Sequence, residues 1–256
     1  MIEIQRLVRR YGDVEAVRGL SLAIPGGKVF GLLGPNGAGK STTLRILATL
    51  IRPTSGTVRI GGFDVTTQAD EVRRIIGYVP EGADLYDALT GMEFLELVAD
   101  LHRLSSESAD ARRRPLLESF DLWDDVGRPI GEYSKGMKQK LLITAALQHD
   151  PTVLLLDEPL DGLDVSAQEV LKGIIHRQAA AGHVVVYSSH ILEVVERLCD
   201  RVAIIHRGRL VADGAPATLL ASRPGKSLAE IFLELTGSSN GEPSDATVST
   251  APIVPA

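Results

Sequence analysis

The stretch Gly34-Pro35-Asn36-Gly37-Ala38-Gly39-Lys40-Ser41-Thr42 decides the fold. Two glycines frame four residues and are followed by a lysine and a hydroxyl residue, which is the pattern of a phosphate-binding loop. Glycines allow backbone N–H groups to converge on phosphate oxygens, Lys40 adds a mobile cation, and the Ser41 hydroxyl can ligate Mg²⁺. We therefore expect a polyphosphate ligand, although a glycine turn that binds nothing has the same local pattern.

The segments beside this loop favour phosphate binding. Residues 29–33 form an apolar run with the length of a buried parallel strand, and residues 44–50 have the spacing of a helix. The positive N-terminal end of that helix would face the phosphates. A strand, a glycine-rich loop and a helix in this order predict a nucleotide-binding α/β core.

Composition and charge restrict the class of protein. The 256 residues, 44% of them hydrophobic, suffice for one α/β domain or two small subdomains. A net charge of −6 argues against nucleic acid as the main partner, because that binding relies on surplus lysine and arginine. The single Cys199 excludes an intramolecular disulfide and is expected in the core. No window approaches the roughly 18 apolar residues of a membrane span, and without a signal peptide we expect a cytoplasmic chain.

The order of the predicted elements indicates an insertion in an α/β domain. Residues 2–24 and 57–65 favour strands joined by turns, whereas residues 92–147 have helical spacing. One apolar helix stripe is expected to contain Phe94, Leu95, Leu97, Val98 and Leu101. Later strands are expected at 153–156, 184–187 and 202–205, with helices at 165–181 and 192–198 between them. This alternation predicts βαβ units and a largely parallel sheet.

Two acidic residues follow the predicted strand at 153–156. Ligands of open parallel sheets gather at the carboxyl ends of strands, so Asp157 is placed to hold Mg²⁺ opposite Ser41. Glu158 can orient or deprotonate a water for attack on the terminal phosphorus. The alternative is that both are solvated acids at the end of a strand.

The segment Tyr133-Ser134-Lys135-Gly136-Met137-Lys138-Gln139-Lys140 resembles the signature motif of ATP-binding-cassette (ABC) ATPases, whose usual form is LSGGQ. Ser134 and Gly136 match that form, whereas Tyr133, Lys135 and Met137 depart from it. In the family this helix N-terminus meets the γ-phosphate of an ATP bound by the opposite subunit, so the resemblance implies a trans contact from Ser134, Lys135 and Gly136. Ser134 can also simply cap a helix, and both roles are compatible.

Other positions fit the same family. Tyr11 matches the aromatic residue that stacks on adenine, although an ordinary turn tyrosine is the alternative. His190 matches the switch histidine that contacts the γ-phosphate. Glu81 stands where the family has the glutamine of the Q-loop, and its carboxylate still offers an oxygen ligand for Mg²⁺. The segment that resembles the D-loop, which crosses between subunits, comprises Asp161, Gly162, Leu163 and Asp164.

The resemblance implies an α/β fold with a P-loop NTPase core, a mainly parallel sheet, an antiparallel β subdomain and a helical subdomain. It covers residues 1–237, with the helical insertion at about 85–150, and residues 238–256 are expected to be a disordered tail. It implies an ATPase with ATP and Mg²⁺ as cofactors, most similar to subunits of ABC-2-type exporters. The implied partners are a second such subunit and an integral membrane permease at the cytoplasmic face of the membrane. A soluble ABC ATPase that acts on nucleic acid or ribosomes is the alternative.

Overall fold

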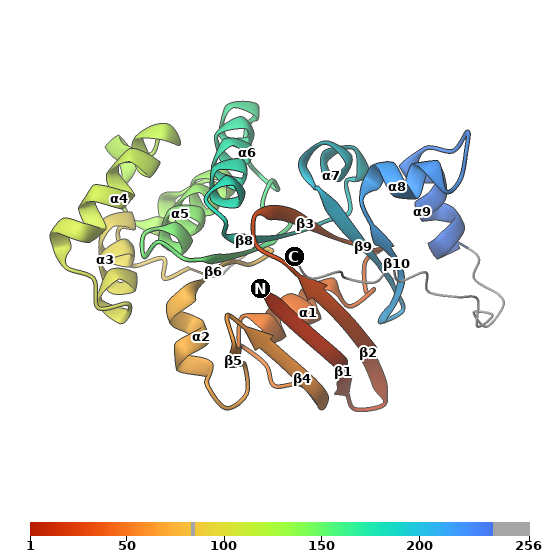
Figure 1. The fold of residues 1–256 in the computed structure, drawn as a ribbon. Coiled ribbons are helices and arrows are strands. Elements are labelled where there is room, and N and C mark those ends of the chain that lie inside the picture. The colour runs from red at the N-terminus through yellow and green to blue at the C-terminus, as the bar shows by residue number, and fades with distance from the viewer. Residues whose placement is uncertain (83–84, 238–256) are drawn as a thin grey trace.

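A six-stranded sheet lies at the centre of the computed structural model, which describes residues 1–82 and 85–237 (Figure 1). Its strand order is β10-β9-β3-β8-β7-β6, and all neighbours are parallel except β9 and β10. The strands are β3 (Lys28–Leu33), β6 (Ile76–Val79), β7 (Val153–Asp157), β8 (Val184–Ser189), β9 (Arg201–His206) and β10 (Arg209–Gly214). The predicted parallel sheet is thus confirmed.

The apolar runs in the central strands result from burial of both sheet faces. On β3, Val29 and Leu33 pack into one hydrophobic cluster, whereas Phe30 and Leu32 pack into the other. All six residues of β8 are buried. Because side chains alternate between faces and both faces are covered, such strands need apolar residues at consecutive positions.

A second sheet is antiparallel and has the strand order β2-β1-β4-β5. Its strands are β1 (Ile2–Tyr11), β2 (Val14–Ile24), β4 (Ser55–Ile60) and β5 (Phe63–Asp64). Tyr11 pairs with Val14 across the tight turn at Gly12 and Asp13. This sheet and α1 (Lys40–Leu47) share a hydrophobic cluster with one face of the central sheet. The strand-and-turn units predicted at 2–24 and 57–65 are therefore present.

The chain between β6 and β7 is helical, as its spacing predicts. It contains α3 (Gly91–Leu101), α4 (Ser106–Ser119), α5 (Lys135–Leu147) and the short 3₁₀ turns η1 (Trp123–Asp125) and η2 (Ile130–Glu132). Phe94 and Leu95 are buried, but Leu97 and Leu101 are 41% and 75% exposed. The predicted stripe is wrong for these two leucines, because they lie one turn apart on a flank of α3 that faces solvent.

The remaining elements are helices outside the segment between β6 and β7. Helices α6 (Val165–Ala180) and α7 (Leu192–Leu198) match their predicted spans closely, whereas α1 ends three residues earlier than expected. The sequence analysis did not predict α2 (Ala69–Ile75), α8 (Pro216–Ala221) or α9 (Leu228–Gly237), although Pro216 at the start of α8 and the Ser227–Glu230 capping pair before α9 are helix-start signals. Cys199 is buried, as expected. The predicted tail at 238–256 lies outside the described residues.

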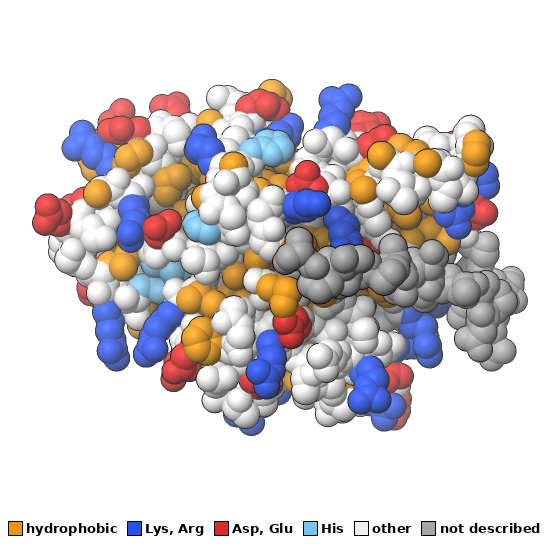
Figure 2. Space-filling view, viewed as in Figure 1, with side chains coloured by type: hydrophobic (Ala, Val, Ile, Leu, Met, Phe, Trp, Pro, Cys, Tyr) orange, Lys and Arg blue, Asp and Glu red, His pale blue; other side chains and the backbone are white. Residues whose placement is uncertain are grey.

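Two general features of the described residues concern possible partners. None of their helices combines the length and apolar character that crossing a bilayer requires. On the face in Figure 2, basic and acidic side chains are interspersed, so that face presents no continuous basic surface.

Candidate functional site

The carboxyl ends of neighbouring parallel strands bring the predicted site residues to one edge of the central sheet. The phosphate loop (residues 34–42) follows β3, His190 follows β8, Glu158 follows β7 and Glu81 lies just beyond β6. Strands β3, β8, β7 and β6 are consecutive in the sheet. Residues separated by more than 150 positions in sequence therefore lie at one edge, which is where ligands of open α/β sheets bind.

The phosphate loop leads directly into α1 without a side-chain cap from the described residues. Gly39 occupies the N-cap position with φ of 105°, and a Cβ there would lie 2.5 Å from the carbonyl oxygen of Ala16. Only glycine meets both restrictions, since other residues rarely adopt this conformation and would collide with the backbone. The uncapped N–H groups of the first helical turn and the positive end of the helix dipole together suit an anion.

Lys40 closes the loop on itself. Its Nζ donates to the carbonyl oxygen of Gly34 at 2.7 Å and to that of Pro35 at 3.4 Å. Burial lowers the pKa of Lys40, and the negative charges of Glu158 and Asp157 oppose this shift. The ammonium group is thus held inside the loop by carbonyl oxygens that phosphate oxygens can replace.

Asp157 is a buried carboxylate that lies near two serine hydroxyls but has no hydrogen bond of normal geometry from the described residues. Neither of its oxygens has a hydrogen-bond partner among the described residues, and its side chain is only 1% exposed. Burial raises the pKa of Asp157, and the nearby hydroxyls of Ser41 and Ser188 partly offset this. An orphaned buried carboxylate beside a serine hydroxyl fits a hard divalent cation such as Mg²⁺, which prefers oxygen ligands.

Glu158 and His190 contact each other directly. The Nδ1 of His190 lies 2.9 Å from Oε1 of Glu158, so an Nδ1–H group donates to the carboxylate. Glu158 is buried and has φ of 48°, and its N–H donates to the carbonyl oxygen of Ser188. A non-glycine residue in the left-handed region is a strained backbone feature that often occurs at functional sites. The sequence suggested both residues separately, but not their hydrogen bond.

Glu81 is exposed and lies close enough to influence the site electrostatically. Its charge adds to the burial that raises the pKa of Asp157 and opposes the burial that lowers the pKa of Lys40, although it makes no hydrogen bond to either. In the described residues, no group of three or more His, Cys, Asp and Glu side chains is arranged to hold a metal. The role of Glu81 as a ligand stays a prediction.

The predicted signature residues begin helix α5 at some distance from the phosphate loop. Ser134 is the N-cap, and its Oγ accepts a hydrogen bond from the N–H of Met137 at 3.2 Å. Tyr133, a departure from the family form, is buried and donates its hydroxyl to the carbonyl oxygen of Asp125. Within the described residues, no hydrogen bond or ion pair joins residues 134–136 to the phosphate loop. The capping role of Ser134 is confirmed, whereas its nucleotide role stays a prediction.

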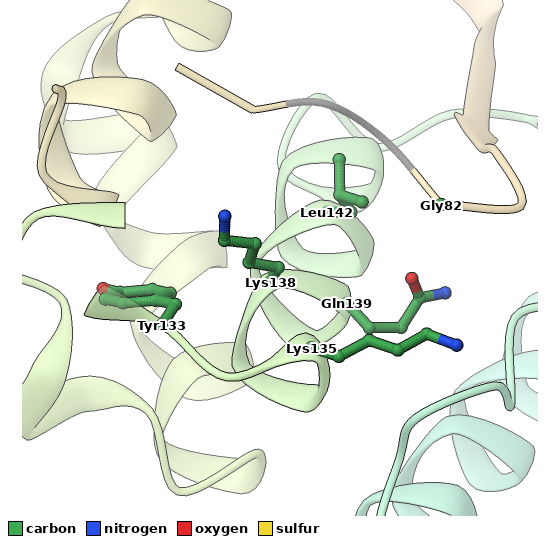
Figure 3. Close-up of a pocket in the computed structure, with 6 residues that line it drawn as sticks. All are labelled: Gly82, Tyr133, Lys135, Lys138, Gln139 and Leu142. Carbon is green, nitrogen blue, oxygen red and sulfur yellow. The ribbon is translucent and has the colours of Figure 1, made fainter. Parts of the chain in front are cut away.

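A cleft of about 280 Å³ lies beside the start of α5 (Figure 3). Gly82 lies on one side of it, and Tyr133, Lys135, Lys138, Gln139 and Leu142 lie on the other. The ammonium group of Lys138 is already paired with Asp87 at 2.8 Å. The cleft thus connects the segment after β6 with the signature residues.

The segment at 161–164 packs against the same helix. The Lys135 ammonium lies 3.8 Å from the Asp161 carboxylate, and Lys140 pairs with Asp164 at 3.0 Å. A Cβ at Gly162, whose φ is 78°, would lie 3.0 Å from Cγ of Lys135. Asp164 also caps α6 by accepting from the N–H of Ala167. Lys135, a departure from the family form, therefore contacts both Asp161 and Gly162 in the fold.

Tyr11 lies at the turn between β1 and β2 and is 43% exposed. The guanidinium carbon of Arg9 lies 4.4 Å from the centre of its ring. Sequence reasoning missed this contact, although residues two apart on a strand point to the same face. The adenine-stacking role of Tyr11 stays a prediction.

Comparisons with known proteins agree on one family. Residues 17–161 match the ABC transporter family. The chain is 39% identical over 238 residues to the ABC transporter ATP-binding protein NatA of Bacillus subtilis, covering 91% of this chain and 97% of the relative. It is 41% identical over 221 residues to the daunorubicin/doxorubicin resistance ATP-binding protein DrrA of Streptomyces peucetius, covering 86% of this chain and 67% of the relative.

Solved structures of the same kind share the fold. An ATP-binding subunit of an ABC transporter superposes with a TM-score of 0.87 at 34% identity, covering 92% of this chain and 99% of that one. A dimeric bacterial ABC transporter cassette superposes with a TM-score of 0.76 at 27% identity, covering 84% of this chain and 98% of that one.

Proposed function

The chain belongs to the ABC transporter family of ATP-binding proteins, and from this premise we propose that it hydrolyses ATP to power export through a separate membrane permease. The convergence of the phosphate loop, Asp157, Glu158 and His190 at one sheet edge carries this proposal. The export direction is supported by relatives such as DrrA, whose name describes drug resistance.

ATP binding uses groups that are already preorganised. The triphosphate enters the phosphate loop, where N–H groups at the start of α1 donate to its oxygens and Lys40 exchanges the carbonyl of Gly34 for phosphate. Ser41 and Asp157 are the residues that would hold Mg²⁺, which neutralises phosphate charge when bound. Tyr11 stacks on the adenine.

Hydrolysis places Glu158 and His190 at the terminal phosphate. Glu158 accepts a proton from the attacking water, whose oxygen then bonds to phosphorus as the bond to the leaving ADP oxygen breaks. His190 holds the Glu158 carboxylate through the 2.9 Å contact at Nδ1, and its Nε2 can donate to the γ-phosphate when both ring nitrogens carry a proton. The two residues therefore act as one unit.

The site becomes complete only in a dimer. Because no hydrogen bond or ion pair of the described residues joins the signature residues to the phosphate loop of the same chain, we infer that Ser134, Lys135 and Gly136 of a second subunit cover the ATP and that the 161–164 segments cross between subunits. The dimer structure of a related cassette supports this arrangement. The permease docks on the cytoplasmic side, where the chain acts as a peripheral subunit.

The hydrolytic role is tested by replacing Glu158 with glutamine, which keeps the shape and removes the base. We expect ATPase activity to fall by about 10²-fold or more, while ATP binding persists. The matched control is Glu107→Gln, because Glu107 is exposed at the start of α4. Unchanged ATPase activity in Glu158→Gln would exclude Glu158 as the catalytic carboxylate.

The transport role is tested by purifying the tagged chain from its native cells. We expect an integral membrane protein to co-purify with it, and ATPase activity to increase when that protein is present in lipid vesicles. If the chain is recovered with ribosomes or DNA and without a membrane protein, the alternative is supported, namely an ABC ATPase that acts on nucleic acid or ribosomes.

A further inference from the structure

Arg9 covers one face of the Tyr11 ring. Its guanidinium carbon lies 4.4 Å from the ring centre, within the range of a cation–π contact. The Nη1 group of Arg9 also donates to the carbonyl oxygen of Arg52 at 3.0 Å. This hydrogen bond to the backbone restricts the position of the guanidinium.

The surrounding strands connect this pair to the phosphate loop. Arg9 pairs with Val17 across β1 and β2, and the neighbouring carbonyl of Ala16 lies against Gly39 of the phosphate loop. Tyr11 lies two residues further along β1, where its pairing with Val14 closes the turn. Tyr11 therefore lies at the end of β1, whose hairpin partner β2 borders the phosphate loop, and 43% of the residue is open to solvent.

We propose that Arg9 is a positioning residue for nucleobase recognition, an inference that rests on the proposed ATP-binding function. An aromatic ring has two faces that can stack. The guanidinium occupies one of them and restricts rotation of the side chain, which leaves the other face presented to the base. A planar base then meets a ring that is already ordered, so less conformational entropy is lost on binding.

The test measures binding of ATP and of inorganic tripolyphosphate, which has no base, by calorimetry at fixed salt. We expect Arg9→Ala to weaken ATP binding by about two- to fivefold, the factor contributed by a half-exposed cation–π contact. Tripolyphosphate binding stays unchanged. Arg9→Lys keeps a cation above the ring and recovers part of the ATP affinity.

The matched control is Arg10→Ala, which removes the same charge from the next position. Arg10 pairs with Glu15 at 3.4 Å and is largely exposed. We expect no difference between ATP and tripolyphosphate in this variant. Tyr11→Ala weakens ATP binding by about fivefold or more, because base stacking is lost, and Arg9→Ala then adds no further loss.

Three outcomes would overturn the inference. In the first, Arg9→Ala weakens the binding of ATP and of tripolyphosphate equally. In the second, Arg9→Ala reduces ATP affinity as much in the Tyr11→Ala background as in the wild type. In the third, Arg9→Ala tightens ATP binding, because the guanidinium occupied the face of the ring that the base needs. A wild-type chain that binds no ATP, or a Tyr11→Ala variant that binds ATP normally, would instead refute the proposed function or the role of Tyr11.

Discussion

Two buried residues at the sheet edge, Lys40 and Asp157, have side chains of opposite charge. Burial lowers the pKa of Lys40 and raises that of Asp157, because removal from water disfavours the charged form of each side chain. The residue types at 34–42, 157 and 158 are readable from the sequence because the chemistry of phosphate binding restricts them. The Glu158–His190 contact was not readable, because it joins residues 32 positions apart whose side chains meet only in the fold. The Arg9–Tyr11 contact was missed, although the two-residue spacing on a strand places both side chains on one face.

Glu81 gives a prediction at this scale. With Glu81 and Glu158 both near the γ-phosphate, ATP binding should depend more steeply on Mg²⁺ than in Glu81→Gln, because the cation must offset one more negative charge. Titrating ATP affinity against Mg²⁺ for both proteins checks this. The partly exposed Glu71 of α2, which pairs with Arg74, serves as control when it is changed to glutamine. Superimposable curves for wild type and Glu81→Gln would contradict the prediction.

Helix α5 links several parts of the site at the scale of an element. Its first turn contacts the 161–164 segment through Lys135, and Gln139 donates to the carbonyl oxygen of Pro159 at 3.1 Å. The sequence predicted the start of this helix from Ser134, because capping chemistry is local. It did not predict the contact between Lys135 and Gly162, because these residues meet only after the chain has passed through β7.

Substitutions at Ser134 separate its two roles. Ser134→Ala removes the cap and should cost about 1 kcal/mol of unfolding free energy. Ser134→Asp retains a capping oxygen and so should unfold like wild type, but its carboxylate would repel a nucleotide held by the second subunit. We expect Ser134→Asp to lose ATPase activity while keeping its urea-unfolding midpoint. A fully active Ser134→Asp variant would limit Ser134 to capping.

At the scale of the whole molecule, a pair of histidines joins the helical part to the central sheet. The rings of His102, after α3, and His149, after α5, stack with centroids 3.7 Å apart. His149 Nε2 donates to the carbonyl oxygen of Ile76, the first residue of β6. The sequence predicted the sheet and the helical insertion, because periodicity reports burial, but neither histidine matched a motif. Their stacking is a tertiary contact without a local signal.

This pair predicts how stability depends on pH. Burial, together with nearby His102, lowers the pKa of His149 to about 4. The unfolded chain takes up a proton near pH 6.5, whereas the folded chain keeps the ring neutral. The contribution of neutral His149 to the free energy of unfolding is therefore fully present above pH 6.5 and is lost as the pH falls toward about 4. Between pH 7 and pH 5 this group should remove about 2 kcal/mol of unfolding free energy.

Urea unfolding at both pH values measures the effect. His149→Gln, which can still donate to the Ile76 carbonyl, should lose most of this pH dependence. His176→Gln, at a position on α6 away from the pair, should keep it. Equal pH dependence in wild type and His149→Gln would assign the acid sensitivity to other groups.

The strand order of the central sheet also determines when the phosphate loop can take its final shape during synthesis. Strand β3 is bordered by β8 and β9, whose residues are made more than 150 positions later. The antiparallel sheet needs only the first 64 residues and can form early, because its pairings are shorter in range. On the ribosome, one edge of β3 stays unpaired until residue 189 has emerged and the other until residue 204 has emerged, so we expect a nascent chain to expose the backbone groups of this apolar strand to aggregation over that interval.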